Sequence, residues 1–142
     1  MPKSRSITYV LSRTQERIVT LKQFINKIKT SPVEKFGVVY LGADHKTCIG
    51  VKILASGNAG CIRRISVDKI LHEAQRLGAR GMILVHNHPR TGQDKLRPSE
   101  ADLHTTFTIH DITKTFGVPV LNHIIYGANN STFSFIHNGI EI

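Results

Sequence analysis

Residues 82–102 read M-I-L-V-H-N-H-P-R-T-G-Q-D-K-L-R-P-S-E-A-D. The first four form an apolar run with the length and composition of a buried β-strand. The run meets H-N-H-P at residues 86–89, where proline removes a backbone donor that a strand would need. After a polar loop, P-S-E-A-D at residues 98–102 has the composition of a helix start. These residues predict a strand, a loop and a helix in that order.

The predicted strand and helix bring together three side chains that can bind a metal. His86 and His88 are two positions apart, and residues i and i+2 of a strand point to the same face. Asp102 falls in the first turn of the predicted helix, from which it can close over both imidazoles. Two histidines and one carboxylate are a ligand set of catalytic zinc, which keeps its fourth position for water. We therefore predict a Zn²⁺ site at His86, His88 and Asp102.

Each half of this pattern also has a purely structural explanation. Two histidines at a strand end can simply lie half-exposed beside a loop, and eight histidines in 142 residues make chance pairs common. Ser99-x-x-Asp102 resembles a capping box, in which the serine caps the helix and the acid binds the serine N–H. Capping and metal binding do not exclude one another, so both stay open for Asp102.

Length and composition are those of an ordinary soluble domain. The 142 residues suffice for one domain with its own core, and 40% hydrophobic with 20% charged residues is typical of globular proteins. No apolar run approaches the ~18 residues of a membrane span, and residues 1–13 lack the apolar core of a secretory signal. Cys48 and Cys61 form neither a CxxC pair nor a disulfide framework. We expect a cytoplasmic protein without membrane contact.

The formal net charge of +9 is unevenly distributed. Residues 1–30 carry +6, residues 31–80 carry +4 and residues 81–142 carry −1. The basic surplus thus precedes the predicted metal site, where it could attract nucleic acid or an acidic protein. A solvated surface explains it equally well, and few aromatic residues are available for base stacking. We expect at most weak nucleic-acid binding.

Periodicity and turn residues indicate a single domain over residues 1–142, in which residues 1–30 form a basic segment and a helix. Ser66 and Gly78 have the positions of an N-cap and a C-terminal stop. Strands alternate with helices and hairpins stand at both ends, which predicts an α/β fold with a mixed β-sheet flanked by helices. The predicted helices cover residues 14–30, 67–77 and 99–116, and the predicted strands cover residues 36–41, 46–54, 82–85, 119–126 and 132–136, with a further extended segment at 7–11.

Several of these residues together resemble a known family. They are Glu34 before the strand at 36–41, H-N-H-P at 86–89, Gly92, Ser99-x-x-Asp102, and H-I-I-x-G at 123–127. Over roughly residues 30–137 the chain is similar to the bacterial RadC-like branch of the JAB/MPN metalloprotease superfamily, whose signature is called JAMM.

This resemblance implies a cytidine-deaminase-like three-layer α/β/α sandwich with zinc bound by the two histidines and the aspartate. Glu34 would deprotonate the catalytic water and pass the proton to the leaving amine, and Ser99 would donate a hydrogen bond to the oxyanion. The implied function is a zinc-dependent metalloprotease or isopeptidase. Its substrate would be a protein or peptide, such as a ubiquitin-like conjugate.

The chain departs from the family pattern in three places. The loop at residues 89–101 is longer than usual, and Asn122 stands where the family has aspartate before His123. The 142 residues also leave no room for the helix-hairpin-helix region of longer RadC proteins. His123 itself could support the site or be a buried core histidine, and both interpretations stay open.

Three other functions compete with the hydrolase. An HNH nuclease spreads its histidines over a ββα unit rather than three consecutive residues, and a zinc deaminase needs H-x-E and P-C-x-x-C motifs that this sequence lacks. The remaining alternative is a DNA-repair-associated, nucleic-acid-binding accessory protein with a structural zinc.

Overall fold

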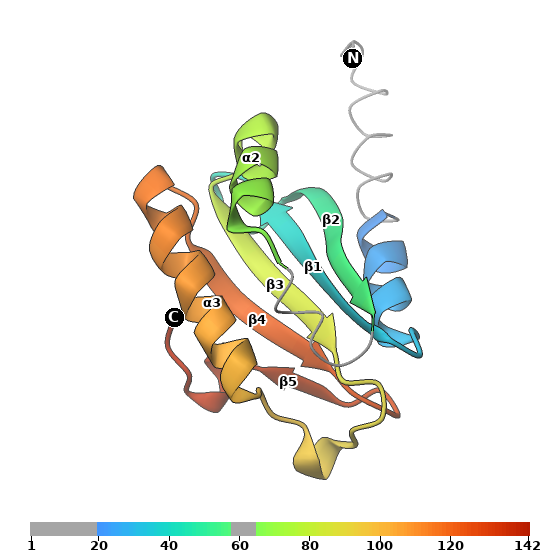
Figure 1. The fold of residues 1–142 in the computed structure, drawn as a ribbon. Helices are drawn as coiled ribbons and strands as arrows, with labels where there is room; N and C mark the ends of the chain where they lie inside the picture. The colour runs from blue at the N-terminus through green and yellow to red at the C-terminus, as the bar shows by residue number, and fades with distance from the viewer. Residues whose placement is uncertain (1–19, 58–64) are drawn as a thin grey trace.

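The computed structural model describes residues 20–57 and 65–142, and they form a mixed five-stranded β-sheet with helices packed against it (Figure 1). The strand order is β2-β1-β3-β4-β5. β3 and β4 are parallel, and the other neighbouring strands are antiparallel. The strands are β1 (Glu34–Leu41), β2 (Cys48–Gly57), β3 (Gly81–Asn87), β4 (Val120–Tyr126) and β5 (Thr132–Ser134). The α/β prediction is confirmed.

Helices cover both faces of the sheet, because the side chains of β1 alternate between two apolar layers. Phe36, Val38 and Tyr40 pack with α2 (Val67–Leu77) and α3 (Glu100–Thr113). The intervening Val39 and Leu41 pack against residues 20–29, which are helical. This is the predicted three-layer α/β/α arrangement. Short 3₁₀ turns complete the described part: η2 (Gln93–Lys95), η3 (Lys114–Phe116) and η4 (Ile136–Asn138).

The helix ends follow the predicted capping signals. The Ser66 hydroxyl accepts a hydrogen bond from the Lys69 N–H at 3.3 Å, and Gly78 ends α2 in the left-handed conformation with φ 71°. Helix α3 ends at Thr113, earlier than predicted, and its last turn tightens into η3 before Gly117 turns the chain with φ 80°.

Several strand boundaries differ from the prediction because pairing partners, rather than local composition, set them. β1 begins at Glu34 because Glu34 pairs with Gly57, and β2 therefore extends to residues 55–57, beyond the predicted strand at 46–54. β3 continues through Asn87, which still pairs with Tyr126 of β4. β5 ends at Ser134, and residues 136–138 form η4 instead.

Two predictions fall outside the described residues: the extended segment at 7–11 and the first part of the helix at 14–30. Within residues 20–57 and 65–142, no helix combines the length and the apolar character needed to cross a membrane.

Candidate metal centre

The carboxyl end of the central strand β3 positions both histidines. His86 pairs with Phe36 on β1 and with Ile125 on β4, and its side chain is 3% exposed. His88 lies just beyond the strand, but its N–H still donates to the Tyr126 carbonyl at 2.8 Å. Since residues 86–88 keep an extended path, both imidazoles reach the same face, as the i, i+2 spacing predicts.

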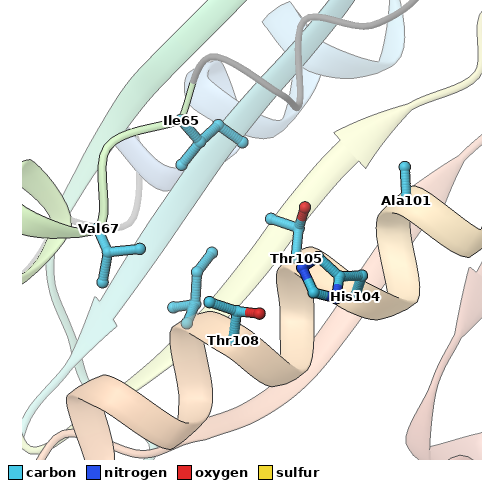
Figure 2. A pocket seen from close by; sticks show the side chains of 7 residues that line it. Ile65, Val67, Ala101, His104, Thr105 and Thr108 are labelled. Atoms are coloured by element: carbon cyan, nitrogen blue, oxygen red, sulfur yellow. The ribbon is translucent and has the colours of Figure 1, made fainter.

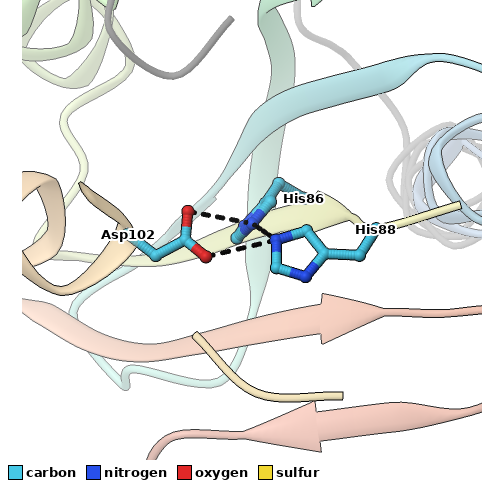
Figure 3. Close-up of side chains that lie close together, drawn as sticks. All are labelled: His86, His88 and Asp102. Carbon is cyan, nitrogen blue, oxygen red and sulfur yellow. Dashed lines mark hydrogen bonds and ion pairs between the residues drawn. The ribbon is translucent and has the colours of Figure 1, made fainter. Parts of the chain in front are cut away.

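Asp102 completes a compact cluster with the two histidines (Figure 3). His86 Nε2 lies 3.0 Å from His88 Nε2 and 3.3 Å from Asp102 Oδ1, and His88 Nε2 lies 3.2 Å from Asp102 Oδ2. Tetrahedral zinc with bonds of about 2.0–2.1 Å separates its ligand atoms by roughly 3.3 Å. The three side chains therefore have the chemistry and the spacing to hold a metal ion.

The pKa shifts of Asp102 and His88 show that the two groups stabilise each other's charged form. Burial opposes ionisation of Asp102, but its contacts with His86 and His88 outweigh burial and hold the pKa of this carboxyl well below its usual range. The hydrogen bond to Asp102 raises the pKa of His88, against desolvation, and the charges of Asp102 and Glu34 add to the rise. The His88 side chain is 19% exposed, so the cluster opens to solvent on that side.

Ser99 and Asp102 also form the predicted capping box. The Ser99 N–H donates to Asp102 Oδ2 at 2.8 Å, and the Asp102 N–H donates to Ser99 Oγ at 3.0 Å. The serine accepts in this bond, so its own hydroxyl hydrogen remains available to donate. Asp102 thus combines the cap with a place in the cluster.

The long loop between His88 and Asp102 is anchored on the β4–β5 hairpin. Leu96 is buried against Ile125 and Phe135, and the Gln93 side chain hydrogen-bonds both backbone groups of Thr132. A Cβ at Gly127 would collide with the Thr91 carbonyl oxygen, which explains the glycine of the H-I-I-x-G motif. Anchoring absorbs the extra length, and Asp102 still reaches the histidines.

Glu34 lies beside this cluster. It is the first residue of β1 and partly buried. Phe36 pairs with His86 in an antiparallel ladder, so continuing the register sets Glu34 opposite His88 and on its face of the sheet. The influence of Glu34 on the pKa of His88 agrees with this placement.

Asn87, between the two histidines, holds the chain next to Glu34, a role that sequence reasoning missed. It is fully buried, and its Oδ1 accepts from the Lys35 N–H at 2.7 Å. Its Nδ2 donates to the carbonyls of Ser31 and Val33 at 3.2 and 3.1 Å. Its side chain points away from the face of its histidine neighbours, so strand alternation was the available signal.

His123 turns out to fit both interpretations, because it is a core histidine that contacts the cluster. Its ring is fully buried and stacks on Phe135 with centroids 4.7 Å apart. Its Nε2 lies 2.7 Å from His86 Nδ1, and its Nδ1 lies 2.7 Å from Thr106 Oγ1. Burial lowers the pKa of His123 well below the usual histidine value, and the neighbouring His86 adds to this. Thr106 was not predicted, although its i+4 spacing from Asp102 places it on the same helix face.

Asn122 has a structural role in place of the family's aspartate. Its Oδ1 accepts from the N–H groups of His123 and Ile136, and its Nδ2 donates to Ser134 at 2.9 Å.

His104, on the next turn of α3, does not join the cluster. It lines a separate hollow of about 330 Å³ together with Ala101 and Thr105, facing Ile65 and Val67 (Figure 2). Among the residues that the structure describes, His86, His88 and Asp102 are the group able to hold a metal.

A three-layer α/β sandwich with H-x-H at the end of its central strand and an aspartate in the following helix is the arrangement of a JAMM-related domain. A family model described as a RadC-like JAB domain matches residues 13–140. The chain therefore belongs to the RadC-like JAB domain family, and the resemblance noted in its sequence is confirmed.

Related proteins are named UPF0758 proteins. One from Fusobacterium nucleatum is 35% identical over 124 residues, covering 86% of this chain and 50% of the relative. One from Finegoldia magna is 36% identical over 110 residues, covering 76% and 46%. One from Burkholderia thailandensis is 34% identical over 114 residues, covering 79% and 40%. The chain thus spans about half the length of the curated relatives it matches.

Proposed function

We propose that this chain is a zinc-dependent hydrolase of the JAMM class that cleaves an amide bond in a protein or peptide. The observation that carries the proposal is that Glu34 begins β1 two residues before Phe36, the partner of His86, and is near enough to His88 for its charge to raise the His88 pKa. Structural zinc sites are closed by four protein ligands and need no base, whereas catalytic sites have three ligands and an open position. Three ligands with a carboxylate alongside favour catalysis.

The residues take distinct roles in this proposal. His86, His88 and Asp102 would hold the zinc ion. When bound, zinc supplies Lewis-acid chemistry that acidifies water and polarises a carbonyl group. Glu34 would accept a proton from the attacking water at its carboxylate and deliver it to the leaving amine. The Ser99 hydroxyl would donate its hydrogen to the developing oxyanion.

The proposed substrates are peptides or isopeptide-linked ubiquitin-like conjugates. The lining of the separate hollow along α3 includes Ala101, which precedes Asp102 in the sequence. Its lining combines aliphatic side chains with threonine hydroxyls, and it would receive an apolar side chain of the substrate.

Glu34→Gln tests the proposal. Glutamine keeps the length of glutamate but cannot accept a proton as a base, so turnover should fall by at least ~10²–10⁴. Zinc content and melting temperature should stay at wild-type values because Glu34 is not one of the three ligands. Initial rates on ubiquitin-like fusions and internally quenched peptides measure the effect, with metal analysis on the same samples.

Glu73→Gln is the matched control. Glu73 pairs with Arg76 on the surface of α2, away from the cluster, and its replacement should leave turnover intact. Full activity in zinc-loaded Glu34→Gln would rule out the JAMM mechanism.

A second candidate is a nucleic-acid-binding accessory protein with structural zinc, associated with DNA repair. Lys22 and Lys27 favour it, because both are exposed on the helical segment that packs against the sheet. Salt-dependent binding to duplex DNA, with no hydrolysis of any peptide or isopeptide substrate, would favour this candidate.

A further inference from the structure

We propose that Thr106 and His123 form a hydrogen-bond relay that fixes His86 in the tautomer whose Nε2 can bind a metal ion. The inference rests on the proposed metal site and makes Thr106 and His123 positioning residues rather than ligands. Three contacts of 2.7 Å carry it: Thr106 Oγ1 to the Asp102 carbonyl oxygen, Thr106 Oγ1 to His123 Nδ1, and His123 Nε2 to His86 Nδ1.

The direction of each hydrogen bond follows from the group at which the relay begins, the backbone carbonyl of Asp102. A backbone carbonyl can only accept, so the Thr106 hydroxyl donates its single hydrogen to the Asp102 carbonyl. The Thr106 oxygen must then accept at its second contact, which makes His123 Nδ1 the donor. A neutral imidazole carries one N–H, so His123 Nε2 accepts, and the hydrogen between the two rings belongs to His86 Nδ1.

The consequence for His86 is a lone pair at Nε2. That atom faces His88 Nε2 at 3.0 Å and Asp102 Oδ1 at 3.3 Å, where the metal ion would lie. In the opposite tautomer a hydrogen would occupy Nε2 and would have to move before binding. Since the relay begins on the Asp102 carbonyl, the helix turn that supplies one ligand also prepares another.

Packing makes the relay rigid. His123 and Thr106 are fully buried, so solvent does not offer substitute partners. Phe135 stacks on the His123 ring at an interplanar angle of 18°, and Phe36 meets its edge at 84°. The ring therefore keeps both nitrogens aligned with their partners.

Thr106→Val tests the relay because valine keeps the shape but loses the acceptor. His123 can then move its hydrogen to Nε2, facing His86 Nδ1, and zinc affinity should fall by about 10–100-fold. Competition with a chromophoric chelator measures the affinity. Histidine ¹⁵N NMR of zinc-free protein should show His86 protonated at Nδ1 in the wild type, and this signature should be lost in the variant.

Thr113→Val is the matched control on the same helix. Thr113 is fully buried, and its hydroxyl finds no hydrogen-bond partner within residues 20–57 and 65–142. The same substitution there should change neither zinc affinity nor the His86 tautomer. Equal affinity and an unchanged His86 spectrum in Thr106→Val would overturn the relay.

A second pair of variants tests the other link without relying on Thr106. Glutamine at position 123 can accept from His86 Nδ1 through its side-chain oxygen, whereas leucine cannot. We expect His123→Gln to bind zinc roughly 10-fold more tightly than His123→Leu. Equal affinities of the two would contradict the relay. A wild-type protein that binds no zinc would instead refute the proposed function, while the tautomer of His86 in zinc-free protein still tests the relay.

Discussion

Asp102 combines the two roles that its sequence position left open, helix capping and a place in the metal-binding cluster. Oδ2 accepts from the Ser99 N–H at 2.8 Å and also faces His88 Nε2, while Oδ1 faces His86 Nε2. An ionised carboxylate offers about four lone-pair sites, so capping leaves capacity for a metal. The cap fixes the carboxylate in the orientation that the cluster needs.

The role of Ser99 can be separated from its cap. As an N-cap alone, Ser99→Ala should cost about 1 kcal/mol of unfolding free energy with turnover of the folded protein intact. If the hydroxyl also stabilises the oxyanion, turnover should drop roughly 10²–10³-fold at unchanged zinc content. We expect the second outcome, measured by urea denaturation and initial rates on one preparation.

Ser66→Ala is the control for Ser99→Ala. Ser66 caps α2 in the same way, through the Lys69 N–H, so its loss should cost similar stability without affecting turnover. Wild-type turnover in Ser99→Ala would leave Ser99 as a cap only.

His88 and His123 give the zinc-free protein opposite responses to pH. The pKa of His123 is lowered, so below about 6.5 the unfolded chain binds a proton that the folded protein does not, and stability falls as the pH drops. The pKa of His88 is raised, so its contribution is complete below about 6.5 and is lost as the pH rises through the folded-state value. We therefore expect a stability maximum near neutral pH in chelator-treated samples.

His88→Gln distinguishes the two contributions. Urea denaturation of this variant between pH 5 and 9 should show no loss of stability as the pH rises, but the loss of stability at acidic pH should remain. An alkaline decline as large as in the wild type would show that His88 is not its source.

At the scale of elements, the site lies where β1, β3 and α3 meet, and Asn87 joins two of them. Its side chain replaces ladder hydrogen bonds beyond the last β1–β3 pair, Phe36 with His86. On the β3 side, this buried amide holds the start of β1, and with it Glu34, while pairing with β2 holds the other side.

Asn87→Ala should separate metal binding from catalysis. The change removes three hydrogen bonds to the backbone of residues 31–35, one of them buried and two partly buried, so the unfolding free energy should fall by about 2 kcal/mol. The ligands are untouched and should still bind zinc, while turnover should fall because Glu34 loses its position. Urea denaturation, metal analysis and initial rates check the three parts.

Asn138→Ala serves as the control. This exposed asparagine donates one side-chain hydrogen bond, to the Ser134 carbonyl, and its loss should be close to neutral. Full turnover in Asn87→Ala would show that Glu34 keeps its position without the hydrogen bonds of the Asn87 side chain.

At the scale of the whole molecule, the basic helix and the metal cluster belong to different faces of the sheet. Phe24 and Ile28 of the helix pack with Val39 and Val85, whereas His86 shares its face with Phe36, which packs with α2 and α3 (Figure 1). Nucleic-acid binding on one face and hydrolysis on the other would therefore be separable.

Charge reversal of Lys22 and Lys27 tests this separation. We expect weak binding of the wild type to duplex DNA, and the double Glu variant should reduce the slope of log K against log salt by about 2. Zinc content and turnover should not change. Fluorescence anisotropy at several salt concentrations gives the slope.

Charge reversal of two exposed lysines elsewhere, Lys46 in the turn between β1 and β2 and Lys95 in η2, is the control and should alter the slope less. A tight complex that survives physiological salt would favour the accessory-protein function.

The sequence by itself determined most of the elements and the three residues of the candidate metal cluster. Strand alternation placed His86 and His88 on one face, and capping signals placed Ser66, Gly78 and Ser99 at helix ends. These patterns are local: they depend on residues within one or two turns or strand steps of each other, and the backbone geometry of each element is the same in every protein.

Only the tertiary structure decided which residues support that cluster. Thr106 meets His123 across 17 positions of sequence, and Asn87 meets Ser31 across 56. The ends of β1 and β2 likewise follow from their pairing with each other. Such contacts depend on strand order and on which buried polar groups need partners. Local composition does not contain that information, because a buried donor takes whatever acceptor the packed chain brings within reach.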